Sequence, residues 1–445
     1  MLPDYLAKAK PNAAGNRAPW YANTAPSYAG IFLWIAFYQQ IAGGTLAHGG
    51  LGLCLVALLL AGLLCYALYY LVPAMLGMQT GFPLYVVGSS TFGATGGYVM
   101  PGLLMGLLQI GWFAVATFFA ADFILKGLGM GSAPGSPSFI MAGVLWGCVM
   151  AWVGAKGIQY VARVSLILNA IPLLMLLIVV FQTAGSAGRY QVAAGQENSF
   201  VAFTSVLAIV IGFFATAGAA GADFGMNARH ASDVKMGGLV GIALAVLVAG
   251  GLPLVSVAGA HGANPGLAGF DYGDVIQSIG GPVASAMFLL FAVASIPPTC
   301  FCAFIAGNSF STMIPGVPRV ASTMAGAAVG IVLAVTGVAA NLISFFTIVG
   351  ASFGPICGAM AADYLLSGRR WPGPRKGINW AGYVAWAVGF VVGILPFLPL
   401  PGDLKPYVQP AVLYSFLTGF LVYALMARVA PPVAGGKTAG VTSWA

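Results

Sequence analysis

The sequence predicts an all-α, polytopic membrane protein with twelve transmembrane helices. Hydrophobic residues make up 60% of the 445 residues and charged residues only 6%, whereas about a quarter of a soluble domain is charged. Apolar runs long enough to cross a bilayer, about 20 residues each, recur along the whole chain. Glycine is abundant, with 63 residues, as expected where membrane helices pack closely or are interrupted. Together these observations exclude a soluble domain.

The apolar runs are separated by short polar loops, so the expected spans can be placed in order. They begin near Pro26, Leu51, Pro101, Phe139, Tyr160, Phe200, Gly237, Gly281, Val320, Asn341, Ile378 and Gln409. An even number of spans places both termini on one side of the membrane.

The basic residues decide which side that is, because short cytoplasmic loops are enriched in Lys and Arg. Of the 17 Lys and Arg residues, all lie on the side of the termini except Lys126, Arg189 and Lys405. We therefore expect a multi-pass protein of the plasma (inner) membrane with both termini in the cytoplasm. The net charge of +8 reflects this topology and does not indicate a nucleic-acid partner. The sequence leaves the oligomeric state open.

Few residues are suited to chemistry. The six cysteines lie inside apolar runs without a CxxC pair, which is typical of small packing residues and not of metal ligands. The three histidines and nine acidic residues do not gather at one depth, and no nucleotide-binding loop is present. We therefore expect a transporter without metal or cofactor and not an enzyme, with a facilitative channel as the alternative.

Two of the expected spans contain helix-breaking sequence. The stretch from Phe200 continues through Gly218 and Gly221 to Asp223, and the first span contains Gly43-Gly44. Irregular backbone at membrane depth is tolerated where it is buried or lines a cavity, and transporters with inverted repeats place such breaks at the substrate site. This pattern predicts a first repeat over 26–183, a second over 200–362 and two additional helices over 378–428. The segments 1–25 and 429–445 would be cytoplasmic.

Polar and aromatic side chains within the spans are candidates for substrate contact. Gln109 and Trp112 are three residues apart and share a helical face, which suits a flat heterocycle that stacks on an indole and bonds to an amide. Phe213, Phe214 and Thr216 would supply an opposing ring and a hydroxyl. The alternative for both groups is helix packing and interhelical hydrogen bonding. Gln39 and Gln40 are adjacent amides in the first span, and at least one is expected to face the interior.

A cation site is a further candidate in the eighth span. Pro297 and Pro298 lack an N–H group, so Val293 and Ala294 would keep unpaired carbonyls, which are suitable ligands for a hard cation. A simple kink is the alternative. Asp122 and Asp223 are candidate proton carriers.

These features resemble the nucleobase–cation symporter-1 family, over roughly Trp20 to Arg370. The resemblance rests on GGT at Gly43–Thr45, TG at Thr80-Gly81, FG at Phe92-Gly93, QxGW at Gln109–Trp112, and the glycine-rich turn into Asp223-Phe224. It implies a leucine-transporter-like fold with five-plus-five inverted repeats and two C-terminal helices. It also implies secondary active import of a nucleobase such as cytosine or a purine, or of a related compound, with cation coupling.

Carried over by motif, the resemblance implies a substrate stacked between Trp112 and Phe214, with Gln109, Phe213 and Thr216 around it. In the eighth span, Cys302 stands where members usually carry an asparagine.

The family's sodium-binding hydroxyls would fall at Ile296 and Pro297, flanked by Ser295 and Thr299. We therefore expect proton coupling in preference to sodium coupling. A hydantoin or allantoin, a vitamin-like pyrimidine or an amino acid is the alternative cargo.

Overall fold

The expected spans all have helical counterparts in the computed structural model, which describes residues 2–156, 158–402 and 404–429. In this described part, nine helices are long and apolar enough to cross a membrane, and the apolar helices Arg319–Val335 and Trp380–Gly393 are shorter. The first span is a pair of short helices, α2 (Thr24–Phe32) and α3 (Ile35–Tyr38). The expected tail over 429–445 lies outside the described residues, apart from Val429.

The helices that define the architecture have the following bounds. They are α4 (Leu51–Leu64), α5 (Leu71–Thr80), α8 (Leu104–Gly127), α9 (Pro137–Lys156), α10 (Ile158–Thr183), α11 (Ser199–Ala219), α12 (Gly221–Gly225), α14 (Ala245–Ala263), α15 (Tyr272–Ile279), α16 (Gly281–Ala294), α17 (Ile296–Met313), α18 (Arg319–Val335), α19 (Leu342–Leu366), α20 (Trp380–Gly393) and α21 (Ala411–Val429).

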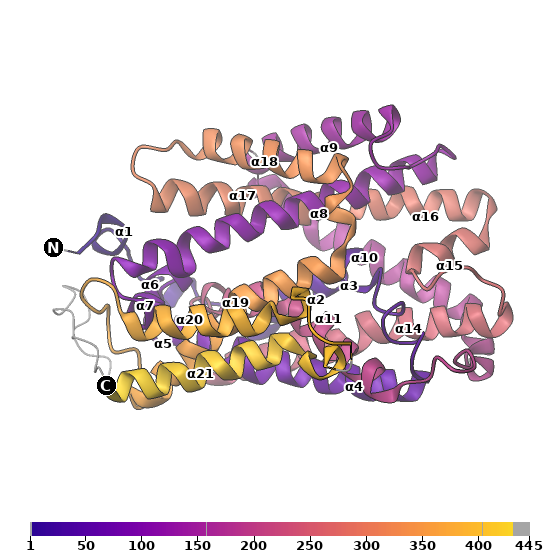
Figure 1. Cartoon of the computed structure of the whole chain (residues 1–445). Coiled ribbons are helices and arrows are strands. Elements are labelled where there is room, and N and C mark those ends of the chain that lie inside the picture. The colour runs from indigo at the N-terminus through magenta and orange to yellow at the C-terminus, as the bar shows by residue number, and fades with distance from the viewer. Residues whose placement is uncertain (1, 157, 403, 430–445) are drawn as a thin grey trace.

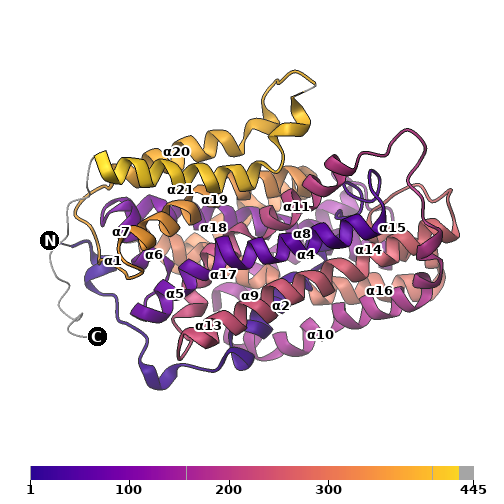
Figure 2. The same cartoon turned by 90° about the horizontal axis from the view of Figure 1, so that it is seen from below.

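Two groups of helices form the centre of the molecule. The helices α8, α9, α17 and α18 pack against one another, while α4 packs against α11 and α14, and α2 packs against α14. Each group takes two spans from the first half of the chain and two from the second, which is consistent with the expected repeats. The helices α20 and α21 pack on α19 along one side of the molecule (Figure 2). The start of the chain at α1 (Asp4–Ala7) and the end of α21 lie at the same end (Figure 1).

The first interrupted span breaks earlier than its glycines predict. Helix α2 ends at Phe32, and Trp34 has an extended backbone with ψ 130° before α3 begins. After Tyr38 the chain continues in turns, and Gly43 and Gly44 lie within them. The break that borders the functional site is therefore at Trp34.

The second expected break lies within its glycine cluster, between Gly218 and Gly221. Helix α11 runs without interruption through Gly218 and ends at Ala219, and α12 follows after Ala220. Gly218 serves close packing, because a Cβ atom there would lie 2.6 Å from Cβ of Tyr69. Gly225 likewise faces the backbone of Ala74, whose carbonyl oxygen a Cβ would overlap. Gly218 and Gly225 therefore bring helices together, and the interruption itself is at Ala220.

The two prolines of the eighth span begin a helix and do not kink one. Helix α16 ends at Ala294, and α17 starts at Ile296 with Pro297 and Pro298 in its first turn. Proline is well tolerated there, because the first N–H groups of a helix have no intrahelical acceptor.

Candidate functional site

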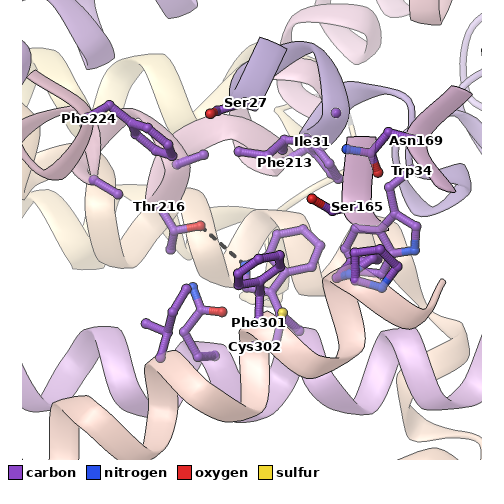
Figure 3. A pocket seen from close by; sticks show the side chains of 18 residues that line it. Ser27, Ile31, Trp34, Ser165, Asn169, Phe213, Thr216, Phe224, Phe301 and Cys302 are labelled. Carbon is purple, nitrogen blue, oxygen red and sulfur yellow. Dashed lines mark hydrogen bonds between the residues drawn. The ribbon is translucent and has the colours of Figure 1, made fainter. Parts of the chain in front are cut away.

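A cavity of about 430 Å³ lies between the two helix groups, within the range that holds small-molecule ligands. Its wall comes from α2, α8, α10, α11, α12 and α17, and it includes the break at Trp34 (Figure 3). Most of the wall is apolar and aromatic, and no charged side chain is among the described residues that line it. Such a wall suits an uncharged, planar ligand, because burying an unpaired charge there would be costly.

Trp112 and Phe213 meet across this cavity. Their ring centroids are 5.2 Å apart and the planes make an angle of 79°, which is an edge-to-face contact. The indole N–H of Trp112 donates to the hydroxyl of Thr216 at 3.2 Å (Figure 3). The expected group of Trp112, Phe213 and Thr216 is therefore assembled on the wall.

Phe214 has a different position from the one that the resemblance implies. Its ring is fully buried and stacks on Phe32 of α2, with centroids 5.4 Å apart and planes at 16°. It is not among the lining residues, whereas Phe213 is. Of the two adjacent phenylalanines, Phe213 is therefore the one that contacts Trp112, and Phe214 packs α11 against α2.

Gln109 and Cys302 both line the cavity. The Nε2 group of Gln109 contacts only the sulfur of Met105, at 3.7 Å, and its Oε1 is buried without a hydrogen-bond partner among the described residues. A buried acceptor without a partner is costly, so a ligand donor would relieve it. The thiol of Cys302 is a weak hydrogen-bond donor.

Gln39 and Gln40 lie outside the cavity wall. The Oε1 of Gln39 accepts the backbone N–H of Gly273 at 3.2 Å, and its Nε2 lies 3.5 Å from the carboxylate of Asp271. Gln40 donates to the carbonyl of Ala340 at 3.5 Å. Gln39 is buried, as expected, but it ties the first span to the start of α15.

The structure adds residues that the sequence interpretation did not select, namely Ser27, Trp34, Ser165, Asn169, Phe224 and Phe301. Trp34 is 8% exposed, and its indole N–H is buried without a partner in the described part of the chain. Asn169 could have been found from the sequence, because an amide within an apolar span indicates function. Trp34 carries no comparable signal, since tryptophan is common in membrane helices.

The proposed cation ligands lie at the junction of α16 and α17. The hydroxyl of Ser295 donates to the carbonyl of Phe291 at 3.0 Å, and that of Thr299 donates to the carbonyl of Ser295 at 2.5 Å. The carbonyl of Val293 accepts a backbone N–H at the end of α16, so it is not left unpaired. Pro297 and Pro298 themselves line the cavity.

The two candidate proton carriers have different surroundings. Asp122 forms an ion pair with Lys126 at 2.8 Å. Asp223 lies in α12, beyond the apolar span of α11, and its carboxylate accepts the N–H of Leu84 at 3.4 Å. Burial raises the pKa of Asp223 to about 6, close to physiological pH.

Comparisons with known proteins match most of the chain. Residues 15–419 match the family described as permease for cytosine/purines, uracil, thiamine, allantoin. Cytosine permease of Escherichia coli O157:H7 is 27% identical over 82% of this chain and 84% of its own, and that of strain K12 is 26% identical over the same shares.

Among solved structures, the fold is similar to that of Mhp1, a nucleobase-cation-symport-1 family transporter, closed with bromovinylhydantoin bound. The TM-score is 0.65 at 18% identity, over 98% of both chains. An inward-facing structure of Mhp1 gives a TM-score of 0.66 at 18% identity, over 95% of this chain and 96% of that one. The family match over most of the sequence shows that this chain belongs to the permeases for cytosine and purines, uracil, thiamine and allantoin.

Proposed function

We propose that this protein imports a small, uncharged, planar heterocycle, a nucleobase such as cytosine or a purine, or a closely related compound. The observation that carries the proposal is the cavity wall, which combines aromatic rings from Trp34, Trp112 and Phe213 with the amide of Gln109 and no charge. Rings supply stacking surface and amides supply donors and acceptors, which are the two features that a nucleobase requires.

Alternating access is supported by the position of the cavity between the two helix groups. Helices α2 and α11 belong to one group, and α8 and α17 to the other. Relative rocking of two such groups about a shared site is the usual way in which repeat-built transporters open to each side in turn.

The cavity extends toward the end of the molecule that holds the termini. Its wall reaches Ser27, near the start of α2, and Phe224 in α12. On the opposite side, Gln39 bonds to the start of α15. With the termini in the cytoplasm, as the basic residues predict, this conformation faces inward.

For the coupling ion we propose a proton in preference to sodium. A sodium site needs several free oxygen ligands around the ion, but Ile296 and Pro297 offer no hydroxyl and the carbonyl of Val293 already accepts a hydrogen bond. Asp223 is the better proton carrier, because the pKa of its carboxyl is raised to about 6, whereas Asp122 is paired with Lys126.

Uptake by proteoliposomes tests both parts of the proposal. The purified full chain is reconstituted and supplied with radiolabelled cytosine, uracil or hypoxanthine, first under a proton gradient without sodium and then under a sodium gradient at clamped pH. We expect accumulation above the external concentration in the first condition, with less in the Asp223→Asn variant. Orotate, a carboxylated uracil, serves as the charged control and should not compete.

Three outcomes would contradict the proposal. Uptake that remains equilibrative under every gradient would indicate a channel. Strong stimulation by sodium alone, lost in Ser295→Ala or Thr299→Ala, would place the coupling ion at the junction of α16 and α17. Stabilisation of the purified protein by amino acids but by no heterocycle would remove the substrate class.

A further inference from the structure

Most polar groups on the cavity wall already have partners within the protein. The hydroxyl of Ser27 donates to the carbonyl of Asn23 at 2.7 Å, and the hydroxyl of Thr216 accepts the indole N–H of Trp112 at 3.2 Å. Ser165 is also engaged. Two carboxamides still offer a donor and an acceptor side by side, those of Gln109 on α8 and Asn169 on α10, whereas the indole N–H of Trp34, which has no partner among the described residues, can only donate.

Asn169 differs from Gln109 in being accessible. It is partly exposed, and neither atom of its amide has a hydrogen-bond partner within the described residues. Figure 3 shows its side chain at the cavity beside Ser165 and Trp34. Ile167, two positions earlier on α10, is 71% exposed. The helix therefore turns one face to the surroundings and presents Asn169 to the cavity.

Gly30 on α2 leaves the space that the Asn169 amide occupies. A Cβ atom at Gly30 would lie 2.5 Å from Nδ2 of Asn169, closer than two such atoms can approach. The amide therefore lies directly against the backbone of α2, and only a residue without a side chain at position 30 leaves room for it there.

Helix α17, which packs against both α8 and α10, cannot supply an equivalent group. Helix α17 contributes Pro297, Pro298, Phe301, Cys302 and Ile305 to the cavity. Prolines and hydrocarbon side chains offer no side-chain hydrogen bond, and a thiol is a weak donor. Recognition by one side chain that donates and accepts side by side therefore has to come from the carboxamides of α8 and α10.

We infer that Asn169 is a specificity-determining residue, and that its amide reads one polar edge of the substrate ring while Gln109 reads another. A carboxamide donates and accepts side by side, as asparagine and glutamine do with adenine. The matching edge is a lactam, –CO–NH–, or an amidine, –N=C–NH₂. The selected ligand is an uncharged ring with two such edges, and this inference rests on the proposed transport of heterocycles.

Packing of α10 against α2 is the other role that Asn169 could have, and ligand methylation separates the two. Dissociation constants are measured on the purified full chain in nanodiscs for cytosine, uracil, 1-methyluracil and 3-methyluracil. A methyl group on a ring nitrogen removes the donor of one edge only. If Asn169 bonds to that edge, replacing it changes how much the methyl group weakens binding. If Asn169 only packs, replacing it weakens the binding of all ligands alike.

In the wild-type protein we expect at least one methylated ring to bind about tenfold or more weakly than uracil. In Asn169→Ala, uracil itself should bind about tenfold to hundredfold more weakly, as for the loss of a paired amide contact. In this variant, the loss of affinity caused by methylation at one of the two ring nitrogens should fall to about twofold or less. Gln109→Leu should remove the penalty at the other position, and Gly30→Ala, which displaces the Asn169 amide, should resemble Asn169→Ala.

Ile167→Ala is the matched control on the same helix and should bind as the wild type does. Asn169→Asp keeps the size of the side chain but loses its donors, so it should fold normally and bind uracil weakly. Equal losses for uracil and both methylated rings in Asn169→Ala, or no loss at all, would assign Asn169 to packing and overturn the inference. Failure of the wild-type protein to bind cytosine, uracil or hypoxanthine would instead overturn the proposed function on which it depends.

Discussion

The ring slot beside Trp112 is closed in this conformation. A heterocycle held between two parallel rings needs them roughly 7 Å apart, twice the usual contact distance, but Phe213 already lies 5.2 Å from Trp112 with its edge toward the indole. A ligand sandwiched between Trp112 and Phe213 would therefore require one of the two rings to turn aside. Phe213 is the better candidate to move, because Trp112 is held by its hydrogen bond to Thr216.

Removing the indole should weaken binding in a graded manner. Trp112→Ala should cost about 1–3 kcal/mol of binding free energy, by analogy with base–aromatic stacking, and Trp112→Phe should cost less because a smaller ring remains. The measurement is the dissociation constant for cytosine or uracil in purified protein. Thr216→Val, which frees the indole N–H but keeps the ring, is the control and should lie between them. Unchanged affinity in well-folded Trp112→Ala would leave this residue a packing role only.

Gln109→Leu should raise the stability of the ligand-free protein and weaken ligand binding. The Oε1 of Gln109 is buried and has no partner among the residues that the structure describes, and an unsatisfied buried acceptor costs about 1–3 kcal/mol. The ligand-free variant should therefore melt at a higher temperature than the wild type, while its affinity for a ring with a lactam edge falls. Thermal unfolding with and without ligand measures both quantities. A lower melting temperature without ligand would show that the amide already has a partner, such as water.

At the residue scale, the sequence predicted which side chains are suited to ligand contact better than it predicted which way they point. Gln109, Trp112, Phe213, Thr216 and Cys302 were selected by residue type, and all line the cavity. Phe213 and Phe214 are adjacent and of the same type, so only the position of α2 decides which of them faces the ligand. Gln39 and Gln40 were recognised as unusual, but their partners come from distant segments that spacing within one helix cannot identify.

At the scale of elements, a glycine within a span can serve close packing of helices or a break in one helix. At Gly77, Gly218 and Gly225 the structure favours close packing. Gly77 on α5 faces α12, where a Cβ atom would overlap the carbonyl of Ala222. The interruption at Ala220 lies within the glycine cluster that predicted it, whereas the one at Trp34 lies well before Gly43-Gly44. A glycine needed for close approach and a glycine needed for a break look alike in one sequence, because both require the absence of a side chain.

Gly77→Ala should therefore destabilise the protein. The added methyl group has no space between α5 and α12, and overpacking of this kind typically costs about 1–3 kcal/mol. Gly52→Ala on α4 is the matched control, because nothing lies within 4 Å of the added atom there and alanine is the better helix former. Melting temperatures should fall for the first variant and stay level or rise for the second. Similar melting temperatures would show that α12 can shift away from α5.

Asp223 should make stability depend on pH. Its pKa is raised to about 6 by burial, against about 3.9 for an unfolded chain, so the native state binds the proton more tightly. The stabilisation is therefore present below about pH 4 and lost as the pH rises to about 6. Asp271 at the start of α15 has a pKa of about 6 for the same reason and adds a change of the same sign.

The melting temperature of the wild type should thus fall between about pH 4.5 and pH 6.5. Asp223→Asn should reduce that fall, and adding Asp271→Asn should reduce it further. Tyr28 and Tyr85 lie near the Asp223 carboxylate but stay protonated over this range. An unchanged slope in Asp223→Asn would mean that the carboxyl titrates at its ordinary pKa.

For the whole molecule, the basic loop after α19 does more than determine topology. Arg375 belongs to the group counted as cytoplasmic charges, but its side chain is 12% exposed and forms an ion pair with Asp363 of α19 at 2.7 Å. It also donates to the carbonyl of Ser90 and to the hydroxyl of Tyr423, each at 2.6 Å. Ser90 in turn donates to the Asp363 carboxylate at 2.8 Å. One buried network therefore joins the loop after α5 to the core helix α19 and to α21.

This network should be cooperative, and a double-mutant cycle measures it. Asp363→Ala leaves the guanidinium of Arg375 buried and unpaired, and breaking a buried ion pair in this way costs about 3–5 kcal/mol. Replacing both Asp363 and Arg375 with alanine should lower the free energy of unfolding clearly less than the sum of the two single losses, because the second replacement removes the unpaired charge left by the first.

The exposed pair of Asp4 and Lys8 is the control, since their side chains are 80% and 78% exposed and pairs screened by water in this way contribute little to stability. Unfolding in detergent of the wild type, the two single variants and the double variant gives the coupling energy. Affinity for cytosine should change little, because neither Asp363 nor Arg375 lines the cavity. Strictly additive losses would mean that water replaces the missing partner and that α21 is held to α19 by helix packing alone.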